Sequence, residues 1–206
     1  MNRPTLSPLS IQRLSAPTAE QRTRIVDVLV HAFVADPFLR WIFPAPADFE
    51  RHFPTLLIAY AGRAFTHGTA DVASNDRGAA LWLPPGVGSD ETAVGELLNT
   101  VLPPERTGPV FDVFEHMSAF HPTAAHWYLP VIGVAPSQQG RGIGAALLRD
   151  ALAHCDRAQA VAYLESTNPR NLPLYLRHGF RVLGEIQIHD APPIIPMRRD
   201  PLPPDK

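Results

Sequence analysis

Residues 131–149, VIGVAPSQQGRGIGAALLR, decide the fold of this chain. Residues 131–134 have the apolar composition of a strand, and residues 143–149 begin an amphipathic helix. Between them, glycine occupies positions 140, 142 and 144. The first N–H groups of a helix have no partner within the helix and lie at the positive end of its dipole, so they bind anions. Because glycine has no side chain to hold a polyphosphate away from these donors, we predict a phosphate-binding turn here.

The composition limits the classes of protein to which the chain can belong. Its 206 residues suit one domain, which we expect at 9–200, between a loose N-terminal tail at 1–8 and a C-terminal tail at 201–206. The net charge of −2 argues against nucleic acid as a partner. The chain lacks the run of about 18 apolar residues that a membrane span needs, so we expect no membrane partner. The single cysteine, Cys155, excludes an internal disulfide and favours a cytoplasmic location.

Strand and helix patterns alternate along the rest of the chain. We expect strands where apolar residues alternate or cluster between turn signals, and helices where they recur every three to four residues. The expected strands are 10–16, 69–76, 78–85, 126–134, 160–167, 180–188 and 193–199, and the expected helical segments are 18–33, 48–66, 90–120, 140–156 and 169–178. Thr18 and Gln21 form a capping-box pattern at the first helix, Pro103 and Pro104 allow 90–120 to be one helix or two, and Gly179 suits the position after the last helix. This order predicts an α/β domain built on a mixed sheet.

Two common phosphate-binding motifs fit the glycine turn poorly. A nucleoside-triphosphate loop needs lysine and serine or threonine after its last glycine, whereas Ala145 and Ala146 follow here. A dinucleotide-binding turn fits the spacing of Gly140, Gly142 and Ala145, and Glu165 falls where a ribose-binding acid would sit. That unit normally opens a series of βαβ repeats, however, and too little of the chain remains for them. We therefore disfavour both ligands.

Two further patterns point to coenzyme A. Directly after VIGVAP, Gln139, Gly142 and Gly144 form a Q-x-x-G-x-G pattern that resembles the coenzyme A signature of the GNAT superfamily of N-acetyltransferases. The segment ESTNPRNLPLYLRHGF resembles a second block of that superfamily, at Asn168, Asn171, Tyr175, Gly179 and Phe180. Within the superfamily, LWLPP, HWYLPVIGVAPSQQGRGIG and LESTNPRNLPLY resemble the puromycin N-acetyltransferase branch.

The resemblance implies a fold and a co-substrate. The fold would be a single GNAT-type α/β domain, with a mixed, mostly antiparallel β-sheet flanked by α-helices and acetyl-CoA in a cleft where two central strands splay. Main-chain groups of the turn would bind the pyrophosphate, and the strand end would pair with the pantetheine arm. Of Asn168 and Asn171, one is expected to be the N-cap of the following helix, and Asn171 is favoured as the residue that contacts the coenzyme. The coenzyme-binding residues so implied are Ile132, Gly133, Val134, Gln139, Gly140, Arg141, Gly142, Ile143, Gly144, Ala145, Asn168, Asn171 and Tyr175.

The resemblance also places Tyr175 beside the coenzyme sulfur as general acid. A tyrosine of pKa about 10 is a weaker acid than a thiol of about 8.5, so a hydrogen bond to the departing thiolate is its expected contribution. An alkylamine of pKa about 10.4 is mostly protonated at pH 7, and a base must accept its proton. Glu165, near the end of the strand before the tyrosine, is our first candidate for this base, followed by His126 and Tyr128.

We expect the chain to acetylate a primary amine of a small molecule by direct attack in a ternary complex, since no cysteine or serine is marked as a nucleophile. Acetylation of a protein N-terminus or lysine, and acyl-CoA binding without catalysis, remain alternatives. The acceptor pocket is expected to be walled by the first two helices, by the segment 36–45 and by the region 90–120. In these walls Asp36, Asp112 or Glu115 could attract a cationic amine.

The sequence predicts no metal site. His116, His121 and His126 recur every five residues, but this spacing does not align side chains on one helical face, and Pro122 interrupts the run. No cysteine or acid completes a set of ligands. The resemblance also admits a homodimer, although no interface can be placed from the sequence.

Overall fold

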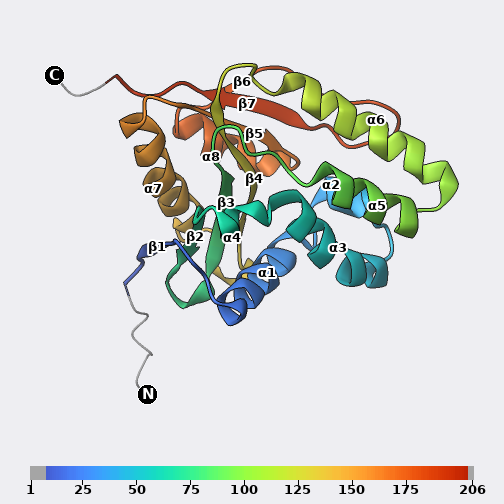
Figure 1. Cartoon of the computed structure of the whole chain (residues 1–206), viewed down its shortest axis with the longest axis horizontal. Coiled ribbons are helices and arrows are strands. Elements are labelled where there is room, and N and C mark those ends of the chain that lie inside the picture. The colour runs from blue at the N-terminus through green and yellow to red at the C-terminus, as the bar shows by residue number, and fades with distance from the viewer. Residues whose placement is uncertain (1–7, 204–206) are drawn as a thin grey trace.

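Seven strands form one sheet in the computed structural model, which describes residues 8–203 (Figure 1). The strand order is β1-β2-β3-β4-β5-β7-β6, and every neighbouring pair is antiparallel except β4 with β5. The strands are β1 (Ile11–Leu14), β2 (Ala70–Ala73), β3 (Gly78–Leu83), β4 (His126–Val134), β5 (Val161–Ser166), β6 (Arg181–Val182) and β7 (Ile195–Arg199). The predicted mixed, mostly antiparallel sheet is confirmed. The predicted tails fall largely on residues 1–7 and 204–206, which lie outside the described residues.

Eight α-helices and three short 3₁₀ turns accompany the sheet among the described residues. The helices are α1 (Ala19–Phe33), α2 (Pro37–Ile42), α3 (Pro46–Ala61), α4 (Arg63–Thr66), α5 (Glu91–Val101), α6 (Pro104–Phe120), α7 (Ile143–Arg157) and α8 (Leu172–Arg177). The 3₁₀ turns are Ser74–Asp76, Pro136–Gln138 and Pro169–Asn171. Within residues 8–203, none of these helices has the length and apolar character needed to cross a membrane.

Helix ends follow the local chemistry of the sequence. Thr18 and Gln21 form a reciprocal capping box at the start of α1, with hydrogen bonds of 3.2 Å and 2.8 Å. Pro103 precedes the first residue of α6, and the predicted helical segment 90–120 is accordingly two helices. After α8, Gly179 takes a φ of +85°, which suits the glycine that commonly follows a helix.

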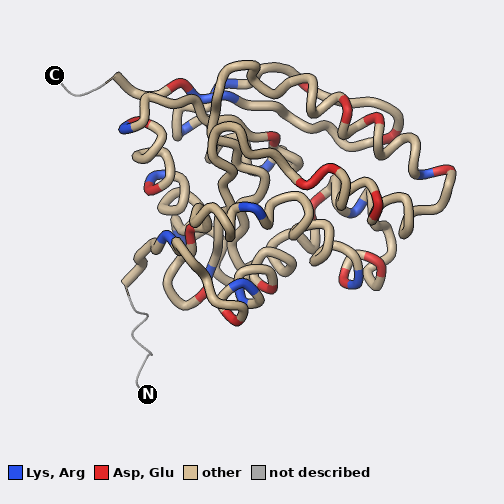
Figure 2. Tube along the Cα trace, viewed as in Figure 1, with Lys and Arg blue, Asp and Glu red and all other residues tan. Residues whose placement is uncertain are grey.

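Two hydrophobic cores lie on opposite faces of the sheet. Successive strand residues point to opposite faces, so Leu81 and Leu83 of β3 enter one core whereas Ala80 and Trp82 enter the other. The first core is covered by α1, α3, α5 and α6, and the second by α7 and α8. Most charged residues lie on the outside, although Asp36, Asp71 and Arg199 are buried. Helices α5 and α6 carry two and three acidic residues respectively against one basic residue, Arg106 (Figure 2).

Three segments differ from the expected elements. Residues 37–42 form α2, and the expected helix 48–66 is interrupted at Gly62, which ends α3. The expected strand over 180–188 pairs only as β6, followed by an isolated bridge between Ile186 and Ile194. Pro196 on β7 accepts a hydrogen bond from Leu183 N–H (2.9 Å) but has no N–H to return, so the ladder ends there.

Candidate functional site

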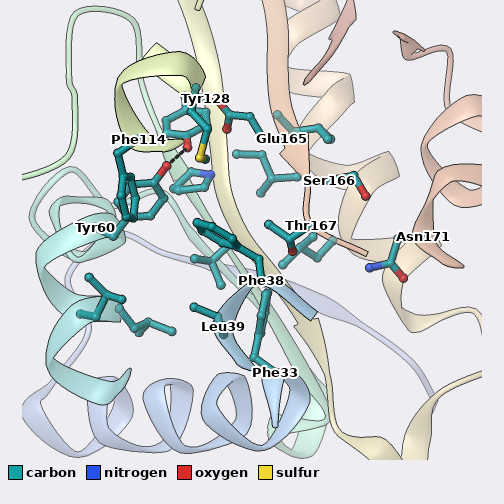
Figure 3. A pocket seen from close by; sticks show the side chains of 18 of the residues that line it. Phe33, Phe38, Leu39, Tyr60, Phe114, Tyr128, Glu165, Ser166, Thr167 and Asn171 are labelled. Atoms are coloured by element: carbon teal, nitrogen blue, oxygen red, sulfur yellow. Dashed lines mark hydrogen bonds between the residues drawn. The ribbon is translucent and has the colours of Figure 1, made fainter. Parts of the chain in front are cut away.

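The two central strands part beyond Tyr128 and Tyr163. The parallel ladder joins His126–Tyr128 to Val161–Tyr163, and the described residues of β4 and β5 beyond it do not pair with each other. On its other side, β4 stays paired with β3 as far as Val134. The gap holds a cavity of about 80 Å³, here called the small cavity (Figure 3). Its walls include Leu129, Ile132, Leu164, Ser166, Asn171 and Tyr175.

Main-chain groups of β4 face this gap at alternate residues. Ala135 N–H donates to the carbonyl of Arg77 (2.9 Å) and continues the ladder with β3. In an antiparallel ladder successive residues direct their N–H and C=O groups to opposite sides. Gly133 therefore points its groups at β3, whereas Ile132 and Val134 turn theirs toward the gap. The strand end thus offers donors and acceptors to a ligand that carries amides.

Gly133 also lets α1 lie directly on the sheet. A Cβ at Gly133 would lie 2.7 Å from Cβ of Ala32 and 3.0 Å from Cδ2 of Leu29, both on α1. Such distances exclude any larger side chain unless the helix moves. The residue therefore fixes the distance between α1 and β4, on the face opposite to α7.

The turn between β4 and α7 exposes backbone donors to open space. Gly140 and Gly142 have φ values of +73° and +77°, and a Cβ at either position would meet no atom within 4 Å. The first hydrogen bond of α7 runs from Ala146 N–H to the carbonyl of Gly142 (3.0 Å), so the N–H groups of 143–145 precede it. No described side chain caps this end of α7. The turn therefore fits an anion such as a pyrophosphate.

Two side chains of the turn between β4 and α7, those of Gln139 and Arg141, have different roles. Gln139 donates through Nε2 to the carbonyl of Val134 (3.2 Å), which ties the turn to the strand end. Arg141 is exposed to solvent between the two left-handed glycines. Its guanidinium is therefore free to approach a phosphate held by the turn.

The first turn of α7 contributes backbone and packing. Ile143 is buried in the core beneath α7. A Cβ at Gly144 would lie 3.4 Å from Cδ2 of Leu174 on α8, and Ala145 is half-buried. These residues are thus available to a ligand mainly through their N–H groups.

Tyr175 forms part of the small cavity's wall. Its side chain is buried and its ring packs edge-on against Phe180, with centroids 6.0 Å apart. Burial raises the pKa of the Tyr175 hydroxyl well above its ordinary value, and the Asp36 carboxylate adds to the rise. The hydroxyl therefore stays protonated at neutral pH and can donate a hydrogen bond, but it is a poor proton donor.

The two asparagines of the second motif have different surroundings. Asn168 accepts a hydrogen bond from Arg170 N–H (3.1 Å) and caps the 3₁₀ turn that follows β5. Asn171 forms no such cap and instead lines the small cavity beyond Thr167 (Figure 3). Of the two, Asn171 is the one placed to contact a ligand in the gap.

Glu165 holds a carboxylate inside the site. Its side chain is only 2% exposed, and its Oε1 lies 3.0 Å from Nε2 of His121. The angles of this contact do not make a hydrogen bond, and Oε1 has no other hydrogen-bond partner among the described residues. Glu165 lies beside Tyr128 in Figure 3. Burial, followed by the charge of Glu165, raises the pKa of both Tyr128 and Tyr163.

His121 and three tyrosines surround this carboxylate. The ring of His121 lies 4.6 Å from the rings of both Tyr128 and Tyr163. The hydroxyls of Tyr60 and Tyr128 are 2.6 Å apart (Figure 3). Among these four rings, the buried carboxylate of Glu165 is the group that can accept a proton.

His126 lies farther from the gap. Its Nδ1 is 2.9 Å from the carbonyl of Ala124, and its ring is 5.5 Å from that of His121. Burial lowers the pKa of His126, so the imidazole is neutral at pH 7. It lines a second, larger cavity and is absent from the wall of the small one.

The second cavity, here called the large cavity, has a volume of about 670 Å³. It lies between α3, residues 86–89, α5, α6 and the start of β4. Tyr60, Phe114, Met117 and Tyr128 line both cavities, so the two adjoin. The walls from α3, α5 and α6 agree with the expected acceptor pocket, whereas no residue of 18–33 or 36–45 lines the large cavity; Phe33, Phe38 and Leu39 line the small cavity instead.

The three acids considered for attracting an amine have separate environments. Asp36 caps α2 through Phe38 N–H and Leu39 N–H and accepts from Thr167 Oγ1 (2.7 Å), so its oxygens are engaged. Asp112 contacts His189 at 2.7 Å. Glu115 lines the large cavity. Glu115 is therefore the acid best placed for this purpose.

Sequence reasoning missed the contributions of His121 and Tyr60. His121 was weighed only as a metal ligand, and Tyr60 lies in an apolar helix where nothing marks it as different from a core residue. Both reach the site through contacts with residues 44 and 68 positions away, Glu165 and Tyr128 respectively. In residues 8–203, no group of three histidine, cysteine or acidic residues is arranged to hold a metal ion.

Two comparisons with known protein sequences give matches. The profile of the acetyltransferase (GNAT) family matches residues 56–180. An uncharacterised N-acetyltransferase from Schizosaccharomyces pombe is 37% identical over 54 residues, which are 26% of this chain and 22% of that protein. The chain therefore spans only a small part of this curated relative.

Solved structures match over most of the chain. A structure described as histone acetyltransferase HPA2 and related acetyltransferase, from Corynebacterium glutamicum, is 30% identical, with a TM-score of 0.64. The match covers 95% of this chain and 98% of that one. Arylalkylamine N-acetyltransferase 2 from Aedes aegypti has the same TM-score, 0.64, at 14% identity, and covers 93% of this chain and 98% of its own. At that identity, the likeness is one of fold.

Proposed function

The chain belongs to the acetyltransferase (GNAT) family, and from this premise we propose that it transfers acetyl from acetyl-CoA to the primary amine of a small molecule. The observation that carries the proposal is the buried carboxylate of Glu165. It stands in the gap between β4 and β5, where the small cavity adjoins the large one. One cavity can hold the end of the coenzyme while the other holds an acceptor.

The coenzyme would lie along the turn and the open strand end. The N–H groups of 140–145 and the open space above Gly140 and Gly142 suit the pyrophosphate. The main-chain groups of Ile132 and Val134 suit the amides of the pantetheine arm. When bound, acetyl-CoA supplies a thioester carbonyl that an amine can attack.

The chain's own residues would then accept the proton of the amine and stabilise the charges that develop on the thioester oxygen and sulfur. Glu165 accepts the proton of the incoming amine, and His121, whose Nε2 lies 3.0 Å from Glu165 Oε1, lines the large cavity from which the amine would come. Val134 N–H faces the gap and can donate to a developing oxyanion. Tyr175 donates a hydrogen bond to the departing sulfur. The attack would be direct: Cys155 lines neither cavity, and the hydroxyls of Ser166 and Thr167 already donate to the carbonyl of Asn168 and to Asp36.

A second candidate function is acetylation of a lysine side chain on a protein. It is favoured by the 30% identical structure, whose description includes a histone acetyltransferase. The resemblance of 81–85, 126–144 and 164–175 to puromycin N-acetyltransferases favours the small molecule instead. Puromycin is therefore the first amine to test.

The decisive experiment measures thiol release from acetyl-CoA with puromycin, polyamines, aminoglycosides, amino acids and lysine peptides, alongside calorimetric binding of CoA. We expect release that depends on a small amine. Glu165→Gln should lower kcat/KM about a hundredfold or more, whereas Glu185→Gln, a change at an exposed glutamate, should not. Release with peptides alone would favour the second function, and CoA binding without release from any acceptor would favour a binding role.

A further inference from the structure

Charge in the two cavities has one sign. Glu91 and Glu115 line the large cavity and Glu165 lines the small one. Among the described residues that line either cavity, none is lysine or arginine. The helices that flank the large cavity, α5 and α6, are acidic along their length (Figure 2).

Arg63, which contacts a lining residue of the large cavity, is already engaged. Arg63 donates through Nη1 to the carbonyl of Gly88 (3.2 Å), which lines the large cavity, and its Nη2 lies 3.7 Å from Asp90. Its charge is thus compensated by Asp90. An anionic ligand group inside the large cavity would find no lysine or arginine among the described lining residues, and of the two histidines there His121 lies against Glu165.

The small cavity, which adjoins the large one, has in its wall a buried carboxylate oxygen without a hydrogen-bond partner among residues 8–203. Glu165 is almost completely buried, and its Oε1 accepts no hydrogen bond from the described residues. An unsatisfied buried oxygen is costly, and a ligand N–H would remove that cost. The walls between this oxygen and the rim are aromatic: Tyr60, Phe111, Phe114 and Tyr128. They suit an apolar body and, through their ring faces, a cation.

We propose that the large cavity is the acceptor site and that it selects amines that carry no carboxylate, such as arylalkyl- and alkylamines, over amino acids. The proposal rests on the proposed function. A carboxylate next to the amine would be desolvated close to Glu165. In the large cavity it would meet Glu91 and Glu115 in the wall and no lysine or arginine among the described lining residues, and the imidazole of His121 already lies against Glu165. A neutral or cationic substituent at the same position meets no such penalty.

A matched series of three acceptors tests the proposal. Phenethylamine has no substituent beside the amine, phenylalaninamide has a neutral one, and phenylalanine has a carboxylate of nearly the same shape. Thiol release is measured with each, and kcat/KM is referred to the neutral amine because the three amines differ in pKa. Calorimetry with each acceptor in the presence of CoA measures binding without turnover.

We expect kcat/KM and affinity to be about a hundredfold lower for phenylalanine than for phenylalaninamide. Equal use and equal binding of the two would overturn the proposal. Binding that discriminates, without any thiol release, would support the site while contradicting the proposed function. Failure of all three acceptors to bind overturns the proposal as well.

A charge reversal checks that the cavity wall is responsible. Glu115→Lys places a cation at the wall and should improve the use of phenylalanine relative to phenylalaninamide about tenfold. Glu96→Lys makes the same change on α5 at an exposed residue outside the cavity lining and should leave the ratio unchanged. An identical effect of both variants would mean that only the overall field of the protein matters.

Discussion

Tyr175 is buried in the wall of the small cavity, and its raised pKa decides which part of the chemistry it can perform. As a hydrogen-bond donor that is too weak an acid to give up its proton, it can stabilise a departing sulfur without full proton transfer. Tyr175→Phe keeps the ring packing on Phe180 and removes only the hydroxyl. We expect kcat to fall about a hundredfold, with the affinity for CoA within about twofold.

Steady-state kinetics and calorimetry of the variant check this prediction. Because burial raises the pKa of Tyr175, its hydroxyl stays protonated as the pH rises past the ordinary tyrosine value, so wild-type kcat should show no alkaline loss from this group near pH 10. An unchanged kcat in Tyr175→Phe would remove the hydroxyl from the mechanism.

The turn before α7 acts as a unit through its backbone. At Gly140 the backbone is left-handed and open, and asparagine and aspartate tolerate that conformation better than other side chains. Gly140→Asn and Gly140→Asp therefore differ mainly in charge. We expect the aspartate variant to bind CoA about tenfold or more weakly than the asparagine variant, by calorimetry. Equal affinities would show that no phosphate lies at this turn.

The elements that sequence patterns predict well are those whose cause is local. The capping box of Thr18, the split of 90–120 at Pro103 and the glycine after α8 are each determined by a few adjacent residues. The segment 180–188 was predicted as one continuous strand, but it pairs only as β6 and at the Ile186 bridge, because Pro196 opposite to it is distant in sequence and cannot return a hydrogen bond.

The whole molecule decides what surrounds the candidate site. Both glycine and asparagine motifs could be found because each is a short run of sequence. The neighbours of Glu165 come from α3, α6, the segment before β4, and β4 itself, and no local pattern brings Tyr60, Phe114 and His121 together. Periodicity predicts which face of each element is buried, but not which buried residues meet.

A partly buried ion pair joins the last strand, β7, to the end of α7. Arg199 on β7 binds Asp156, the next-to-last residue of α7, through two hydrogen bonds of 2.7 Å and 2.8 Å, and Asp156 also accepts from Leu202 N–H (2.8 Å). The pairing with Arg199 lowers the pKa of Asp156. Arg199 is buried, so removing its partner leaves a buried charge.

We expect Asp156→Asn to lower the free energy of unfolding at pH 7 by about 2 kcal/mol, measured by urea denaturation. Because the folded pKa is depressed, the pair stabilises the protein above the unfolded pKa of about 3.9 and is lost as pH falls through the folded value. The difference between wild type and variant should therefore shrink as the pH is lowered below about 4. Asp27→Asn, at an exposed residue of α1, should change stability by no more than about 0.5 kcal/mol. A difference for Asp156→Asn that is constant down to pH 2 would mean that its cost lies in packing rather than in the charge.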